Sequence, residues 1–279
     1  MSKNNIVDAP APFGGTGVWH RMNLAIHTTL DYEFPVPVDI LLQIEAAAIP
    51  EQQVISANID LPKVEHFARV PAQDGVGERI WLRMGGRLQI EYRAEVAIQR
   101  ILADPASLPG VPPHLLPGEA VPYLMPSRYC PSDQFHDFVF NNFGHLPEGP
   151  RVAAIRDWVA SNVAYVPGSS HSQTTAIDTF HGGQGICRDY AHLVITLVRA
   201  ANIPARIASV YALGVEPPDF HAVAEVFLGD TWHLVDATGM AQEGAMAKIG
   251  IGRDAADVAF LSIFGEGRMV SQQVSVEPA

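Results

Sequence analysis

The sequence is poor in cysteine and in basic residues and has no long apolar run, and each shortage argues against a class of protein. The 279 residues include two cysteines, Cys130 and Cys187, too few for a disulfide framework or a cysteine-rich zinc site. Acidic residues outnumber basic ones by 30 to 18. Because Lys and Arg form no run that could follow a phosphate backbone, we expect no nucleic-acid partner. No stretch of about 18 apolar residues occurs, so we expect no membrane-spanning helix.

The segment from Met1 to Asp8 also lacks the features of a secretory signal. It contains one positive charge, and no apolar segment of about 7 to 15 residues follows it. We therefore expect a cytoplasmic protein without a membrane partner. The composition, 48% hydrophobic and 17% charged, is typical of a globular chain, and the length allows two domains.

Alternation of apolar and polar residues dominates the N-terminal part of the chain. It occurs in residues 24–34, 38–44, 80–84 and 88–98. A period of two is typical of a half-buried strand, and no segment here has a convincing helical period. Gly85-Gly86 is expected to form a hairpin turn between the last two strands. Residues 1–103 are therefore predicted to form a small antiparallel β domain.

Prolines cluster after this region, with seven between Asp104 and Pro126. Proline removes a backbone donor and favours extended chain, so residues 104–122 are predicted to be a linker. Strands before residue 104 and strands after residue 150 should then lie in separate sheets.

The region after the linker combines helical and strand patterns, so residues 123–279 are predicted to form an α+β domain. A helix of about 14 residues is expected behind Pro150, because apolar residues recur there at helical spacing. A second helix is expected to begin at about Cys187, since a glycine-rich stretch precedes it and apolar residues recur until Asn202 and Pro204.

Cys187 is therefore predicted to lie at a helix N-terminus. The partial positive charge and the unpaired N–H groups of such a terminus favour thiolate over thiol. The backbone N–H of Cys187 could also donate to an oxyanion formed by attack on a carbonyl. These properties predict a nucleophile, although position alone leaves open a small buried hydrophobic residue.

A predicted hairpin supplies a base and a carboxylate. Gly229-Asp230 is expected to be its two-residue loop, which places Val223 opposite Asp236. Because side chains alternate along a strand, His221 shares the face of Val223 and is the diagonal neighbour of Asp236. We therefore predict that Asp236 orients His221, the base of the site.

Other residues are alternatives within the same chemistry. The hairpin register turns His233 to the opposite face, and Cys130 lies in a proline-flanked stretch with no helix start to activate it, so both are interpreted as structural. Tyr165 and Gln184 are candidates for a second oxyanion donor. The 11 histidines include no His-x-x-x-His or His-Glu-x-x-His pair on a predicted helix, so no metal or other cofactor is predicted.

Several motifs together resemble the transglutaminase-like superfamily, in particular short bacterial proteins described as candidate cysteine proteases. The matching segments are 123–130, 185–192, 202–206, 221–226, 236–239 and 250–258. The resemblance spans most of residues 120–265. It implies a papain-like arrangement in which a helix bearing Cys187 packs on an antiparallel sheet that carries His221 and Asp236. The N-terminal strands are similar to the β domain that often precedes this catalytic domain.

The residues and the resemblance together predict a Cys187–His221–Asp236 triad that cleaves amide or peptide bonds through a thioester, with a peptide or protein as substrate. Transfer of the acyl group to an amine is left open, because nucleophile, base and orienting carboxylate are common to both reactions. A catalytically silent scaffold that binds a peptide or protein is the alternative outside enzymes.

Overall fold

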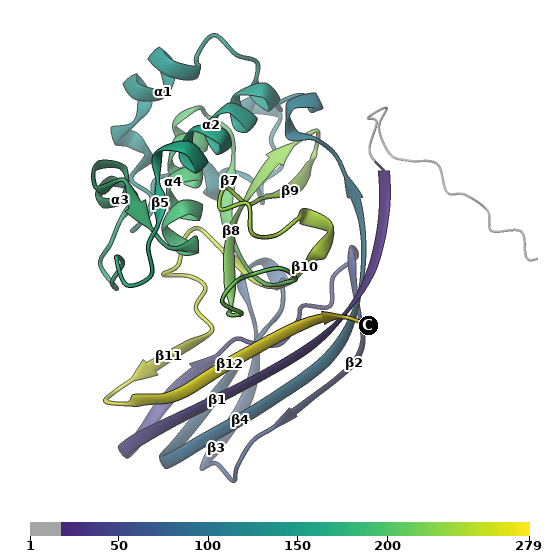
Figure 1. Cartoon of the computed structure of the whole chain (residues 1–279), viewed down its shortest axis with the longest axis vertical. Helices are drawn as coiled ribbons and strands as arrows, with labels where there is room; N and C mark the ends of the chain where they lie inside the picture. Colours follow the sequence, from purple (N-terminus) through teal and green to yellow (C-terminus); the bar gives the residue numbers. More distant parts are fainter. Residues whose placement is uncertain (1–17) are drawn as a thin grey trace, which may run out of the picture.

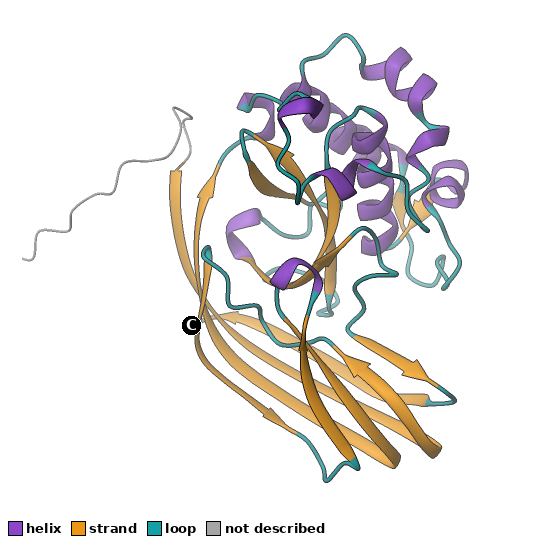
Figure 2. Ribbon diagram, turned by 180° about the vertical axis from the view of Figure 1, so that it is seen from behind, coloured by secondary structure: helices purple, strands orange, loops and turns teal. Residues whose placement is uncertain are grey.

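The computed structural model describes residues 18–279 and consists of a long curved sheet beside a helix-covered unit with a second sheet (Figure 1). Part of the predicted N-terminal domain, residues 1–17, lies outside the described residues. Figure 2 shows the arrangement from behind, with the helices gathered at one end of the molecule and the long sheet at the other. None of the helices within residues 18–279 combines the length and the apolar composition of a membrane span.

The long sheet has six strands, and its two central strands are each 25 residues long. The central strands are β1 (Val18–Leu42) and β4 (Glu78–Leu102), with β2 (Gln52–Asp60) and β3 (His66–Pro71) beside β4, and β11 (Leu261–Phe264) and β12 (Arg268–Pro278) beside β1. The predicted alternation is confirmed, since Leu24, Ile26 and Leu30 of β1 are buried and pack with alternate residues of β4.

The predicted hairpin turn at Gly85-Gly86 is wrong, because β4 runs through both glycines. The irregularity lies in the paired strand, where residues 35–37 of β1 bulge out of register. A Cβ on Gly85 would lie 3.0 Å from the backbone nitrogen of Pro37, and Gly86 has a φ of 80°, which glycine adopts readily. The two glycines therefore accommodate a bulge in the neighbouring strand.

The proline-rich segment contains no strand, but the sheets on its two sides are not separate. After β4 the chain forms the 3₁₀ turns η2 (Pro105–Ser107), η3 (Pro113–Leu115) and η4 (Val121–Leu124). The expectation of separate sheets is wrong because β11 and β12 pair with β1. Residues 261–278 satisfy backbone groups that β1 would otherwise leave unpaired at an edge, and Val274 joins the core of the long sheet. The remainder of the predicted division stays a prediction.

The helix-covered unit is built around α4 (Cys187–Ala200), which begins at the predicted residue. The other elements are η5 (Ser132–Gln134), α1 (His136–Phe143), α2 (Glu148–Asn162), α3 (Ala176–Gly182), the parallel pair β5 (Ala164–Tyr165) and β6 (Gln184–Gly185), and an antiparallel sheet in the order β10 (Met246–Gly252), β7 (Ala205–Ala212), β8 (His221–Leu228) and β9 (Thr231–Val235). The helix predicted behind Pro150 is α2. Helices combined with antiparallel sheets confirm the predicted α+β class.

Buried polar contacts join the long sheet to the second sheet. Tyr211 of β7 donates its hydroxyl proton to Ile44 O at 2.7 Å. Gln52 of β2 exchanges hydrogen bonds with the backbone of Lys248 in β10. Lys248, a residue only 3% exposed, forms an ion pair through Nζ with Glu51 at 2.6 Å. These contacts satisfy buried polar groups at the junction and so favour one packing of the two sheets.

Candidate active site

The first turn of α4 is closed by one of its own side chains. Asp189 Oδ2 accepts a hydrogen bond from Ile186 N at 2.9 Å, which satisfies a backbone donor at the helix start. Gly185 fits because it has no side chain, since a Cβ there would lie 2.7 Å from Asp189 Cβ. Cys187 is left partly exposed beside the positive end of the helix dipole. The cysteine therefore stands at a helix N-terminus, as predicted.

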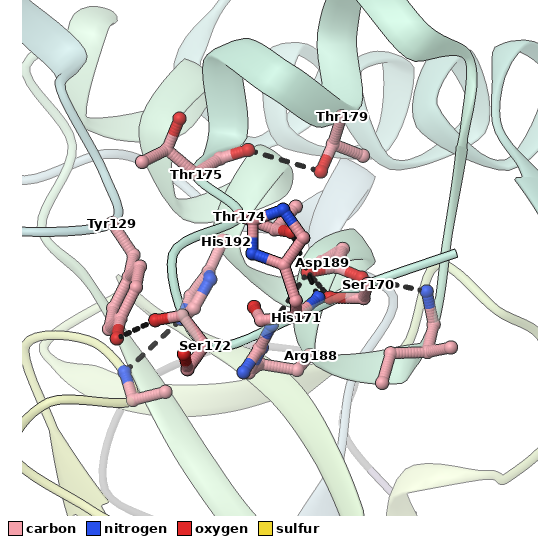
Figure 3. Close-up of polar contacts among 12 residues, drawn as sticks. Tyr129, Ser170, His171, Ser172, Thr174, Thr175, Thr179, Arg188, Asp189 and His192 are labelled. Atoms are coloured by element: carbon pink, nitrogen blue, oxygen red, sulfur yellow. Dashed lines mark hydrogen bonds and ion pairs between the residues drawn. The ribbon is translucent and has the colours of Figure 1, made fainter. Parts of the chain in front are cut away.

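Arg188 fixes a segment that lies against this end of α4 (Figure 3). Its Nη2 donates to Ser170 Oγ at 2.6 Å and to His171 O at 2.8 Å. Tyr129 donates its hydroxyl proton to Ser172 O at 2.7 Å. Three consecutive residues of the segment are thus bound, two of them by the residue that follows Cys187. These hydrogen bonds hold residues 170–172 against the first turn of α4.

The loop between β8 and β9 has the predicted register. Leu228 lies opposite Thr231. Gly229 and Asp230 have φ values of 56° and 64°, the left-handed conformation of a two-residue hairpin loop. The register therefore continues along both strands as the sequence indicates, and Asp236 follows directly after β9.

His221 and Asp236 meet across this hairpin. His221 Nε2 lies 2.9 Å from Asp236 Oδ2, and both side chains are almost fully buried. Asp236 Oδ1 accepts further hydrogen bonds from the backbone N–H and the hydroxyl of Thr238, at 2.8 and 2.6 Å. His233 lies opposite Val226, on the other face of the sheet. The carboxylate partner therefore belongs to His221 and not to His233.

The contacts of His221 favour its protonated form. Burial alone would lower the pKa of His221, but the hydrogen bond with Asp236 and the nearby Cys187 thiol raise it to about 9. Burial likewise acts to raise the pKa of Asp236, yet hydrogen bonds from His221 and Thr238 hold it below its usual value. Because Nε2 faces Asp236, Nδ1 is the nitrogen available to the thiol, and within residues 18–279 this buried atom has no hydrogen-bond partner. Such a geometry can support a thiolate–imidazolium pair.

Tyr165 also lies beside Cys187. It lies opposite Gly185 in the parallel pair of β5 and β6, which ends two residues before Cys187. The Tyr165 hydroxyl lies beside the backbone N–H and the thiol of Cys187, and burial raises the pKa of Tyr165 to about 12, so the hydroxyl keeps its proton. The sequence indicates both Tyr165 and Gln184 as candidate oxyanion donors. A two-residue parallel pairing has no periodic signal that could distinguish them in advance.

The second cysteine and the histidine on α4 are buried. Cys130 is fully buried, which raises the pKa of its thiol to about 12, and this thiol donates to His192 O at 3.6 Å. His192 is also fully buried, accepts a hydrogen bond from Ala255 N at 3.1 Å, and stacks on Tyr129. These contacts agree with structural roles for both residues. In residues 18–279, no three His, Cys, Asp or Glu side chains are grouped so that they could hold a metal ion.

Known proteins resemble this chain in sequence and in fold. The core model of the transglutaminase-like superfamily matches residues 141–237, a range that contains Cys187, His221 and Asp236. The crystal structure of a candidate cysteine protease from Cytophaga hutchinsonii is 33% identical to this chain, with a TM-score of 0.88, and the match covers 94% of this chain and 93% of that one. The chain belongs to the transglutaminase-like superfamily.

The likeness extends beyond the transglutaminase-like core. Because the Cytophaga hutchinsonii match covers 94% of the chain, the long sheet is part of the shared structure. An uncharacterised protein of Mycobacterium leprae is 32% identical over 156 residues, which are 52% of this chain and 55% of that protein. The chain thus spans about half the length of the curated relative it matches.

Proposed function

We propose that the protein is a cysteine-dependent hydrolase that cleaves amide or peptide bonds, with Cys187 as nucleophile, His221 as base and acid, and Asp236 as orienting carboxylate. The observation that carries this proposal is the contact of His221 Nε2 with Asp236, which leaves Nδ1 for the thiol at the start of α4. Similarity to a candidate cysteine protease supports the same class of activity.

In the proposed reaction, the thiolate of Cys187 attacks the carbonyl carbon of the substrate, and the carbonyl π electrons move to the oxygen. The backbone N–H of Cys187 and the hydroxyl of Tyr165 donate hydrogen bonds to this oxyanion. The tetrahedral intermediate collapses to a thioester as the C–N bond breaks, and the leaving amine takes a proton from His221. Water, deprotonated by His221, then attacks the thioester, which releases the acid and restores the thiolate.

Asp236 has a supporting role in this scheme. Its hydrogen bond fixes the ring orientation of His221 and stabilises the imidazolium while the thiolate is present. The carboxylate can do this because Thr238 binds its second oxygen, so the group cannot rotate freely. The pKa of Asp236 lies below its usual value, and the carboxylate therefore stays ionised at neutral pH.

Labelling with electrophilic peptide probes, followed by mass spectrometry of the modified residue, tests the proposal. Cys187→Ala should lose both the label and the hydrolysis of the peptide. Cys130→Ala, the matched control, should keep both, because the Cys130 thiol that it removes is buried and out of reach of the probe. Labelling that persists in Cys187→Ala and disappears in Cys130→Ala would refute the assignment. A primary amine added to the reaction distinguishes hydrolysis from acyl transfer, since transfer yields an amide in place of the acid.

A further inference from the structure

The loop that follows Asp236 binds the carboxylate together with His221. Asp236 Oδ2 accepts a hydrogen bond from Ala241 N at 3.1 Å in addition to its contact with His221. Thr238 donates twice to Oδ1. Since donors of this loop reach both oxygens, the direction of the carboxylate depends on where the loop lies.

The far end of this loop is docked on the long sheet. The 3₁₀ turn η6 (Glu243–Ala245) lies against β1 and β4. Arg100 of β4, 6% exposed, donates from Nη1 to the carbonyls of Glu243 and Met246. Gly244 fits because a Cβ at this position would lie 2.4 Å from Cδ2 of His20 in β1. The position of the turn is therefore set by strands that carry no residue of the proposed triad.

The side chain of Glu243 reaches from the turn back to the hairpin. Its Oε1 accepts a hydrogen bond from Leu234 N at 3.3 Å, two residues before Asp236. β9 is the edge strand of its sheet, so an outward N–H there has no neighbouring strand to bind it. Glu243 supplies the acceptor, and β9 is thereby connected to a turn held by Arg100.

We propose that Glu243 is a positioning residue, which ties β9 to the turn docked on the long sheet and thereby fixes Asp236 relative to His221. The catalytic consequence rests on the function proposed above, whereas the placement of Asp236 does not. Charged groups on three other strands face Glu243: Arg100 on β4, Lys248 on β10 and Glu225 on β8. His20 on β1 packs against the same turn.

Three substitutions of Glu243 separate hydrogen bonding from charge. Glu243→Gln keeps an oxygen acceptor for Leu234 N, Glu243→Asp keeps the charge on a side chain one methylene shorter, and Glu243→Ala removes the acceptor. Gln242→Ala, an exposed neighbour in the sequence, is the matched control. In the full-length protein, NMR titration reports the pKa of His221, the rate of alkylation by iodoacetamide reports Cys187, and thermal unfolding reports stability.

If Glu243 positions Asp236, the Asp and Ala variants lower the pKa of His221 by about one unit or more, and alkylation of Cys187 at pH 7 slows about tenfold. Glu243→Gln and the control stay within about twofold of the unsubstituted protein. A fall in melting temperature with an unchanged His221 pKa would assign a purely structural role and overturn the proposal. The His221 titration does not depend on catalysis, so it still decides the question if Cys187 proves not to be the nucleophile.

Discussion

The long sheet and the helix-covered unit are each stabilised by a different kind of contact. In the long sheet, β1 pairs with strands from the opposite end of the chain, and its core consists of alternate side chains of long strands. In the other unit, every residue of α4 from Asp189 to Ala200 is buried, and the contacts of Ile186 with Asp189 and of His221 with Asp236 join residues 3 and 15 positions apart. The long sheet therefore contributes support, whereas the residues of the proposed triad are concentrated on one helix start and one hairpin.

The largest effect on turnover is expected when the carboxylate of Asp236 is replaced by an amide of the same shape. Asp236→Asn should leave the fold intact but fail to hold His221 in its orientation and tautomer. The expected loss of turnover is about 10² to 10⁴, the upper value being the scale of the analogous change in serine proteases. Turnover of a peptide substrate and thermal unfolding of the same variant provide the measurement.

His233→Gln is the matched control for this substitution, because His233 occupies the same hairpin on the opposite face. It should reduce turnover much less than Asp236→Asn does. Equal losses in the two variants would contradict the assignment of roles and would indicate that the hairpin as a whole, rather than the His221 partner, limits the reaction.

The next effect concerns the pH dependence of the helix-covered unit. The pKa of His221, raised from 6.5 to about 9, means that the imidazolium is present below about 9 and is lost as pH rises through that value. Peptide hydrolysis should therefore decline above about pH 9, because the leaving amine no longer receives a proton from His221. The same sign applies to stability, since the contribution of His221 is full below 6.5 and is lost as pH rises through about 9.

Alkylation of Cys187 by iodoacetamide gives the comparison for this prediction. The reaction needs the thiolate but no proton for a leaving amine, so its rate should not fall in the same pH range. A parallel decline of hydrolysis and alkylation would argue that the protein unfolds or that another group titrates.

A smaller effect, on stability alone, is expected in the long sheet. Val274→Ala removes two methyl groups from a residue that is 7% exposed, which should lower the free energy of unfolding by about 1.5 to 2 kcal/mol. Val270→Ala, on the same strand but 39% exposed, should cost clearly less. Chemical denaturation measures both variants. At a temperature where both variants are folded, their turnover should equal that of the unsubstituted protein. A loss of turnover in Val274→Ala would contradict the view that the long sheet stabilises the fold and takes no part in the reaction.

These differences also explain which features could be predicted from the sequence. The start of α4 and the Gly229-Asp230 loop depend on neighbouring residues, so glycine content and strand alternation sufficed to predict them. The pairing of β12 with β1 joins opposite ends of the chain, and no local pattern specifies a partner at that separation. The role of Gly85-Gly86 is ambiguous from the sequence, because glycines in a hairpin turn and glycines beside a bulge in the neighbouring strand have the same local sequence.

The smallest effect concerns Glu243, where the two regions meet. Burial raises the pKa of Glu243 from 4.5 to about 7, although Arg100 and Lys248 favour the ionised form. A raised pKa of an acid means that its contribution to stability is full below about 4.5 and is lost as pH rises through about 7. Glu243→Gln cannot titrate, so the melting temperature of the unsubstituted protein minus that of the variant should decrease between pH 5 and pH 8. Because Glu243 is not fully buried, we expect a change of about 1 kcal/mol, or about 2–4 °C for a chain of this size. A melting-temperature difference that does not change with pH would mean that Glu243 does not titrate in this range. A difference that increases from pH 5 to pH 8 would mean that the charges of Arg100 and Lys248 outweigh burial at the junction.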